Sequence, residues 1–155
     1  MRKIIYSISA IGLMALAACG GDGNSNNNGT IDISGKTKQE VFMLHSWALT
    51  SWIDSGQGEK TESIEACKKD DTYDFTTTTS FKVTNNTKCD PSDNAEDVLP
   101  WGMSSANASS VVIFSQNWDI AKMTGEKITL TRKYLFNFPS GSTDTMYSTM
   151  IFEKK

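Results

Sequence analysis

Histidine and cysteine, the residues that most often carry catalysis or bind metals, are scarce in this sequence. The 155 residues include one histidine, His45, and three cysteines. So small a ligand set is poor for zinc, and no nucleophile stands in a motif with a base. The acidic pair Asp70-Asp71 fits hydrogen bonding in a turn better than acid–base chemistry. We therefore expect no enzyme activity, no metal and no cofactor.

Basic residues are also in the minority. Lysine and arginine number 15 against 18 acidic residues, which gives a formal net charge of −3. Binding to nucleic acid or to anionic lipid headgroups normally needs a basic patch. We expect neither kind of electrostatic partner.

The first 18 residues have the pattern of a secretory signal. Arg2 and Lys3 precede an apolar run over residues 4–18, which is too short for a comfortable transmembrane helix. The run ends in Leu16-Ala17-Ala18-Cys19, which resembles the lipobox of bacterial lipoproteins. We expect cleavage before Cys19 and lipidation of its thiol, rather than an ordinary secretory signal with a cysteine there by chance. Because Gly20 and not aspartate follows, the resemblance implies the outer membrane of the cell envelope.

Residues 19–37 are predicted to form a tether. They are rich in glycine, asparagine and serine, with too little apolar surface to offset the entropy of ordering. The sixteen residues from Gly20 to Gly35 span roughly 20–24 Å as a flexible coil. Residues 38–155 then form one domain.

Two cysteines remain for that domain if Cys19 is lipidated. An exported chain meets an oxidising compartment, so the even remainder predicts a disulfide between Cys67 and Cys89. The alternative is a metal site that includes His45.

Short apolar-alternating runs separated by polar turns indicate β-structure through the domain. A helical signal is weak and confined to residues 60–68. Eight such strands favour a small antiparallel up-and-down barrel, with a sandwich as the alternative. The predicted strands cover residues 43–54, 72–75, 81–84, 99–104, 111–115, 119–123, 127–133 and 145–153.

The domain resembles the lipocalin-like lipoproteins of the Bacteroidetes over residues 41–155. The most specific match is Cys67-Lys68-Lys69-Asp70-Asp71-Thr72-Tyr73-Asp74-Phe75, close to a Cys-x-x-Asp-Asp-x-Tyr-x-Phe signature. Looser matches are Trp47-Ala48-Leu49-Thr50, Thr87-Lys88-Cys89-Asp90, Trp101-Gly102-Met103-Ser104 and Ile128-Thr129-Leu130. The turn over residues 76–79 and the connection over residues 137–144 depart from the family pattern.

The resemblance implies an eight-stranded barrel with an interior pocket for a small, mostly hydrophobic molecule. It also implies that Trp47 on the first strand and Arg132 on a late strand pack together and close one end, in a cation–π contact. The alternative for Arg132 is an exposed position at a strand end. The residues expected to line a pocket are aromatic or methionine: Trp47, Phe75, Phe81, Trp101, Met103, Met146 and Met150.

Two functions follow from these expectations. The first is a lipid-anchored protein that binds a small hydrophobic or amphipathic ligand without catalysis. The second is a structural or protein-interaction module of an envelope complex. Side chains can fill a barrel this small completely, and a filled barrel would favour the second function.

Overall fold

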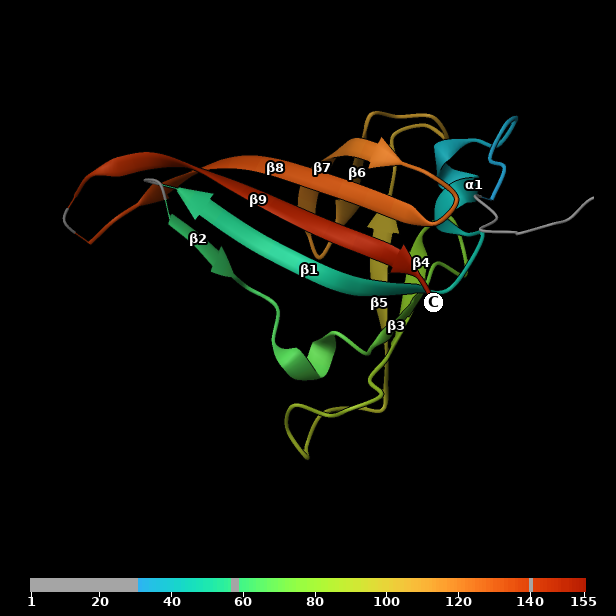
Figure 1. The fold of residues 1–155 in the computed structure, drawn as a ribbon, viewed down its shortest axis with the longest axis horizontal. Coiled ribbons are helices and arrows are strands. Elements are labelled where there is room, and N and C mark those ends of the chain that lie inside the picture. The colour runs from blue at the N-terminus through green and yellow to red at the C-terminus, as the bar shows by residue number, and fades with distance from the viewer. Residues whose placement is uncertain (1–30, 57–58, 140) are drawn as a thin grey trace, which may run out of the picture.

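The structure is a computed structural model that describes residues 31–56, 59–139 and 141–155. Nine strands form one antiparallel sheet in the order β2-β1-β3-β4-β5-β6-β7-β8-β9, and β1 also pairs with β9. That last pairing closes eight strands into a barrel, and β2 is an additional strand (Figure 1). The predicted all-β, eight-stranded antiparallel barrel is therefore confirmed. The predicted signal segment and Cys19 lie outside the described residues.

The described chain contains one α-helix, one 3₁₀ helix and nine strands. They are α1 (Lys38–Phe42), β1 (Trp47–Gly56), β2 (Glu59–Glu62), the 3₁₀ helix η1 (Ala66–Lys68), β3 (Thr72–Asp74), β4 (Ser80–Thr84), β5 (Glu96–Gly102), β6 (Ser110–Ile113), β7 (Gln116–Met123), β8 (Lys127–Asn137) and β9 (Thr143–Lys154).

The helix α1 closes one end of the barrel. Its first turn carries a capping box, in which the Thr37 side chain accepts from the Glu40 backbone and the Glu40 side chain accepts from the Thr37 backbone. On the opposite face of the helix, Val41 and Phe42 are buried, and the Phe42 ring lies 5.0 Å from that of Phe75 and 5.2 Å from that of Trp101. Apolar burial against the barrel therefore holds a helix too short to be stable by itself.

The prediction of a helical signal over residues 60–68 needs correction. Residues Glu59–Glu62 form β2, which pairs with the end of β1, and only Ala66–Lys68 are helical. Backbone N–H and C=O groups of β2 form hydrogen bonds with β1, and this non-local pairing outweighs the weak local preference for a helix.

Residues 31–37, the last part of the predicted tether, are described by the structure, and two of their side chains contact the domain. Ile33 packs against the core, and Ile31 lies so close to Gly125 that a Cβ added there would meet it at 2.5 Å. These two apolar side chains attach the end of the predicted tether to the domain.

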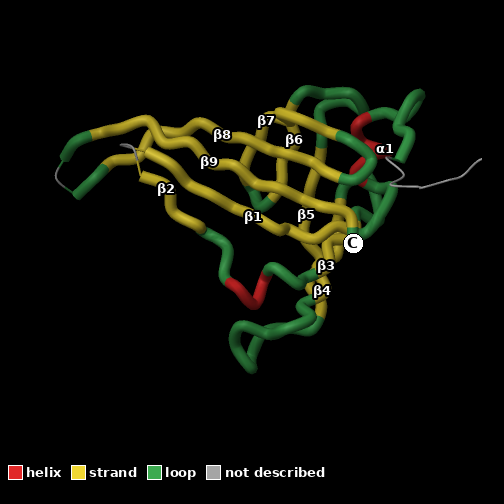
Figure 2. The backbone as a smooth tube through the Cα atoms, viewed as in Figure 1, coloured by secondary structure: helices red, strands yellow, loops and turns green. Residues whose placement is uncertain are grey.

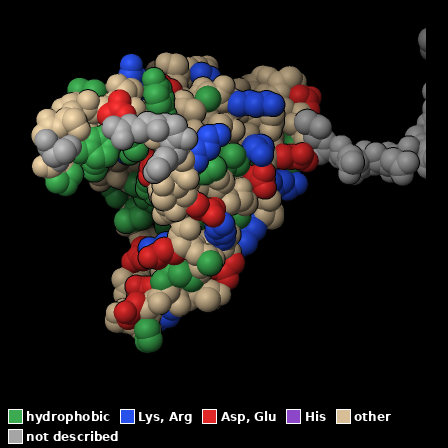
Figure 3. All heavy atoms as spheres, turned by 60° about the vertical axis from the view of Figure 1, so that its left-hand side comes forward, with side chains coloured by type: hydrophobic (Ala, Val, Ile, Leu, Met, Phe, Trp, Pro, Cys, Tyr) green, Lys and Arg blue, Asp and Glu red, His purple; other side chains and the backbone are tan. Residues whose placement is uncertain are grey.

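The strands β1, β8 and β9 continue past the barrel as a twisted arm, with β2 along one side (Figures 1 and 2). Pairing of β7 with β8 stops at Thr131, whereas β8 and β9 stay paired to Asn137 and Thr143. The arm exposes Leu135, Phe136 and Tyr147. Figure 3 is turned to bring the arm forward. In this view, hydrophobic side chains line the recess between the arm and the part of the molecule below it.

Candidate functional site

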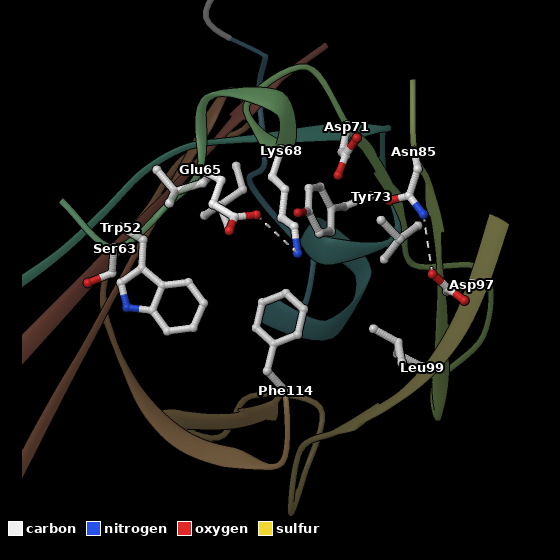
Figure 4. A pocket seen from close by; sticks show the side chains of 13 residues that line it. Trp52, Ser63, Glu65, Lys68, Asp71, Tyr73, Asn85, Asp97, Leu99 and Phe114 are labelled. Carbon is white, nitrogen blue, oxygen red and sulfur yellow. Dashed lines mark hydrogen bonds and ion pairs between the residues drawn. The ribbon is translucent and has the colours of Figure 1, made fainter. Parts of the chain in front are cut away.

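A cavity of about 510 Å³ opens at the end of the barrel opposite α1 (Figure 4). Its walls are apolar and its mouth is polar. The apolar lining comprises Leu49, Trp52, Ile64, Tyr73, Val83, Leu99 and Phe114. The polar lining comprises Ser63, Glu65, Lys68, Asp71, Asn85 and Asp97.

Strand alternation explains most of the apolar wall, but Trp52 enters it through a bulge. On β1, Leu49 pairs with Phe152 and Ser51 with Ile151, so Thr50 is an extra residue in the ladder. An extra residue reverses the alternation of the strand. As a result Trp52, and not Ser51, shares the inner face with Leu49 and lies opposite the buried Met150.

Phe114 forms the floor of the cavity from an unusual backbone position. Phe114 and Ser115 make the two-residue turn between β6 and β7, and both have positive φ, at 53° and 60°. Turns of this kind favour asparagine and glycine, and a left-handed backbone costs other residues on the order of 1–3 kcal/mol. The Phe114 ring packs 5.9 Å from Trp52, 5.6 Å from Phe81 and 6.3 Å from Tyr73. These aromatic contacts offset the cost of the turn.

The mouth is held by the connection through η1 and by the β4–β5 loop. The Sγ atoms of Cys67 in η1 and Cys89 in that loop lie 1.91 Å apart, which confirms the predicted pair at disulfide distance. Glu65 lies close to both sulfurs. Because the sulfurs are joined to each other, neither is a free thiolate that could bind a metal with Glu65.

Hydrogen bonds and an ion pair hold the polar side chains at the mouth. Asp71 is 2% exposed and accepts a hydrogen bond from the Asn86 backbone N–H at 3.2 Å. Burial raises the pKa of its carboxyl. Asp97 accepts from the Asn85 side chain at 3.3 Å, and the Lys68 amine lies 3.7 Å from Glu65.

The seven residues predicted to line a pocket do not line this cavity. Trp47, Phe75, Phe81, Trp101 and Met150 belong to the buried core, and Met103 packs against it. The Met146 sulfur lies on the arm against Gly56. The prediction was wrong because α1 fills the end of the barrel where the aromatic residues gather, and the open space lies at the other end.

The predicted pair of Trp47 and Arg132 is also wrong. Along β9, Lys154 pairs with Trp47 and Ser148 with Arg132, so the two residues are separated by six positions, or about 20 Å. The guanidinium of Arg132 instead stacks on Trp118, 4.9 Å from the ring centre, and on Tyr134 at 4.5 Å. The indole N–H of Trp47 donates to the carbonyl of Phe42 at 2.8 Å.

His45 lies away from the cavity. Its ring meets that of Trp47 edge-on at 6.1 Å, and its Nε2 has no hydrogen-bond partner within the described part of the chain. Burial, followed by the charge of Lys154, lowers the pKa of this imidazole.

Comparisons with protein-family models, with curated proteins and with solved structures find no match to this chain. Within the described ranges, no helix combines the length and apolar character needed to cross a membrane.

Proposed function

We propose that this protein is a lipid-anchored, non-enzymatic cell-envelope protein that binds a small amphipathic molecule. The observation that carries the proposal is the cavity of about 510 Å³ with apolar walls and a polar mouth. Ligand sites commonly have volumes of about 300–1,000 Å³, apolar linings and a few polar groups that orient the ligand. The apolar part of the ligand would lie against Trp52 and Leu99, with its polar end at the mouth.

The closed eight-stranded barrel is compatible with the lipocalin-like family that the sequence resembles. The resemblance supports a binding role, although fold alone does not define function. Attachment to the membrane, with the outer membrane as the expected location, rests on the lipobox-like residues Leu16 to Cys19.

The cavity is tested by filling it. Leu99 lines the cavity, whereas its neighbour Val98 is 70% exposed on the outer face of the same strand. We expect Leu99→Trp to weaken binding of the neutral fluorescent probe N-phenyl-1-naphthylamine by at least about tenfold, since the indole occupies the space the probe needs. Val98→Trp is the matched control and should bind the probe as the wild type does.

Circular dichroism of both variants establishes that they are folded. Unchanged probe binding by a folded Leu99→Trp protein would show that the cavity is not the binding site. The anchor is tested separately by labelling cells with a radioactive fatty acid. The label should enter the wild-type protein and be absent from Cys19→Ala.

A second function, docking of a protein partner, is favoured by the arm. Leu135 is 71% exposed, Tyr147 52% and Phe136 42%, which is unusual for three large apolar side chains on one short region. Replacing Leu135 and Phe136 with serine would abolish co-purification of an envelope protein by this surface and leave probe binding unchanged.

A further inference from the structure

The charges at the mouth of the cavity are unbalanced in favour of acid. Three carboxylates line the cavity, those of Glu65, Asp71 and Asp97, against the single amine of Lys68. A smaller hollow of about 80 Å³ shares Lys68, Asp71 and Asp97 with the cavity and adds Asp93. A polar head group that settles at this mouth therefore meets more negative than positive charge.

A hydroxyl that faces the cavity independently indicates a polar ligand group. Tyr73 is 4% exposed and lines the cavity, and Figure 4 shows its hydroxyl directed toward the Lys68 side chain. No hydrogen bond to this hydroxyl occurs among residues 31–56, 59–139 and 141–155, and its oxygen is not among the buried unpaired atoms of these residues, so it is accessible from the cavity. A ligand atom or water in the cavity can therefore form the hydrogen bond that this hydroxyl lacks within the protein.

Aromatic faces surround the space below the mouth. The rings of Trp52 and Phe114 are stacked 5.9 Å apart, and Tyr73 meets Phe114 edge-on at 6.3 Å. The face of an aromatic ring carries partial negative charge and attracts cations, most strongly for tryptophan. These rings and the carboxylates therefore favour the same sign of charge in a ligand.

Among the described residues that line the cavity, Lys68 is the one cation. Its side chain is 52% exposed, and its amine forms an ion pair with the carboxylate of Glu65 at 3.7 Å. The Glu65 side chain is 65% exposed. Figure 4 shows the amine suspended over the cavity between Trp52 and Tyr73. Because an exposed ion pair of this kind contributes little to stability, the Lys68 side chain can move away from Glu65 with only a small loss of free energy. A ligand ammonium group would then take the place of the amine.

We propose that the cavity binds an amphiphile whose head group is cationic, such as an alkylammonium. The inference rests on the proposed ligand-binding function and specifies the head group. The apolar tail lies against Leu49, Leu99 and Phe114, and the ammonium lies among the carboxylates with the Tyr73 hydroxyl as an acceptor.

Three probes with the same tail test the head group. Decylammonium, decanol and decanoate are titrated at neutral pH into the purified protein, with displacement of N-phenyl-1-naphthylamine as the readout. We expect decylammonium to bind about tenfold more tightly than decanol, and decanoate most weakly. Decanoate binding as tightly as decylammonium would overturn the cationic head group but leave ligand binding intact. Failure of all three probes to bind would instead overturn the proposed function.

Two variants exclude a general effect of the tail. Lys68→Met removes the competing amine and should tighten decylammonium binding several-fold without changing decanol binding. The matched control is Lys69→Met, because Lys69 pairs with Glu62 at 2.6 Å and does not line the cavity. Asp97→Asn should weaken decylammonium and spare decanol. Weaker decylammonium binding by Lys68→Met, or equal loss of all probes in Asp97→Asn, would contradict the proposal.

Discussion

The two ends of the barrel differ in whether side chains fill them. At one end α1 brings Val41 and Phe42 against Phe75 and Trp101, and all four are at most 4% exposed. Backbone hydrogen bonds from Gln39 to Ala106 and side-chain bonds such as Lys38 N–H to Asn107 attach the helix to the β5–β6 loop. At the other end the described residues form no α-helix, and the cavity remains open between the 3₁₀ helix η1 and Phe114.

The difference shows how one small barrel can combine a filled core with a cavity. An eight-stranded barrel is just wide enough for side chains to fill. Here α1 and the rings of Phe42, Phe75 and Trp101 fill one end. The other end is lined by side chains that leave a space, and a disulfide supplies part of the order that packing does not. We therefore expect the filled end to contribute most of the stability and the open end to serve the proposed binding.

The largest expected effect tests this division directly. Phe42→Ala removes a ring that is 0% exposed and touches two aromatic neighbours, so we expect the free energy of unfolding to fall by about 3–5 kcal/mol. Phe114→Ala removes a half-buried ring at the open end and should cost only about 1–2 kcal/mol. Urea denaturation followed by circular dichroism measures both. Equal losses would show that the open end carries as much of the stability as the closed one.

The disulfide gives the next largest effect. Cys67 and Cys89 are 22 positions apart, and in the chain-entropy model closing a loop of that length contributes about 3 kcal/mol. The double variant Cys67→Ser/Cys89→Ser should lose about that much stability and also bind N-phenyl-1-naphthylamine more weakly, because η1 and the β4–β5 loop hold the mouth. The reduced wild type is the control and should match the double variant. If probe binding were unchanged, packing alone would order the mouth.

Local pattern was sufficient to predict much of the fold but not the cavity. The strand predicted over residues 127–133 lies within β8, where Ile128 and Leu130 are 0% exposed. The pairing of Cys67 with Cys89 followed from cysteine count. The helix α1 was not predicted, although the capping box Thr37-x-x-Glu40 is a sequence signal for the start of a helix.

The residues that line the cavity depend on non-local structure. Trp52 reaches the inner face because of the bulge at Thr50, and a bulge is defined only by pairing with β9. Phe114 stands in a turn position that favours other residues, so its sequence gives no turn signal. The choice of which end is filled depends on where α1 docks, and strand periodicity contains no information about that.

The smallest expected effect compares two carboxyls, one at each end. Burial raises the pKa of Asp71 at the mouth, so the folded protein binds its proton more tightly than the unfolded chain does. The free energy of unfolding therefore falls as the pH rises from the ordinary aspartate pKa through the raised value. Asp71→Asn stays neutral and can still accept from the Asn86 N–H, so it should be more stable than the wild type at pH 7 and equal to it below pH 3.8.

Glu40 at the helix end should behave in the opposite sense. Hydrogen bonds from the backbone N–H and the hydroxyl of Thr37 lower the pKa of Glu40, so its carboxylate stabilises the fold at neutral pH and that contribution is lost as the pH falls through the lowered pKa. Glu40→Gln should therefore be less stable than the wild type at pH 7, with the difference vanishing in acid. Urea midpoints of the three proteins between pH 3 and pH 8 measure both trends. A destabilising Asp71→Asn at neutral pH would mean that the mouth needs this charge for folding, and the division of roles between the two ends would then be wrong.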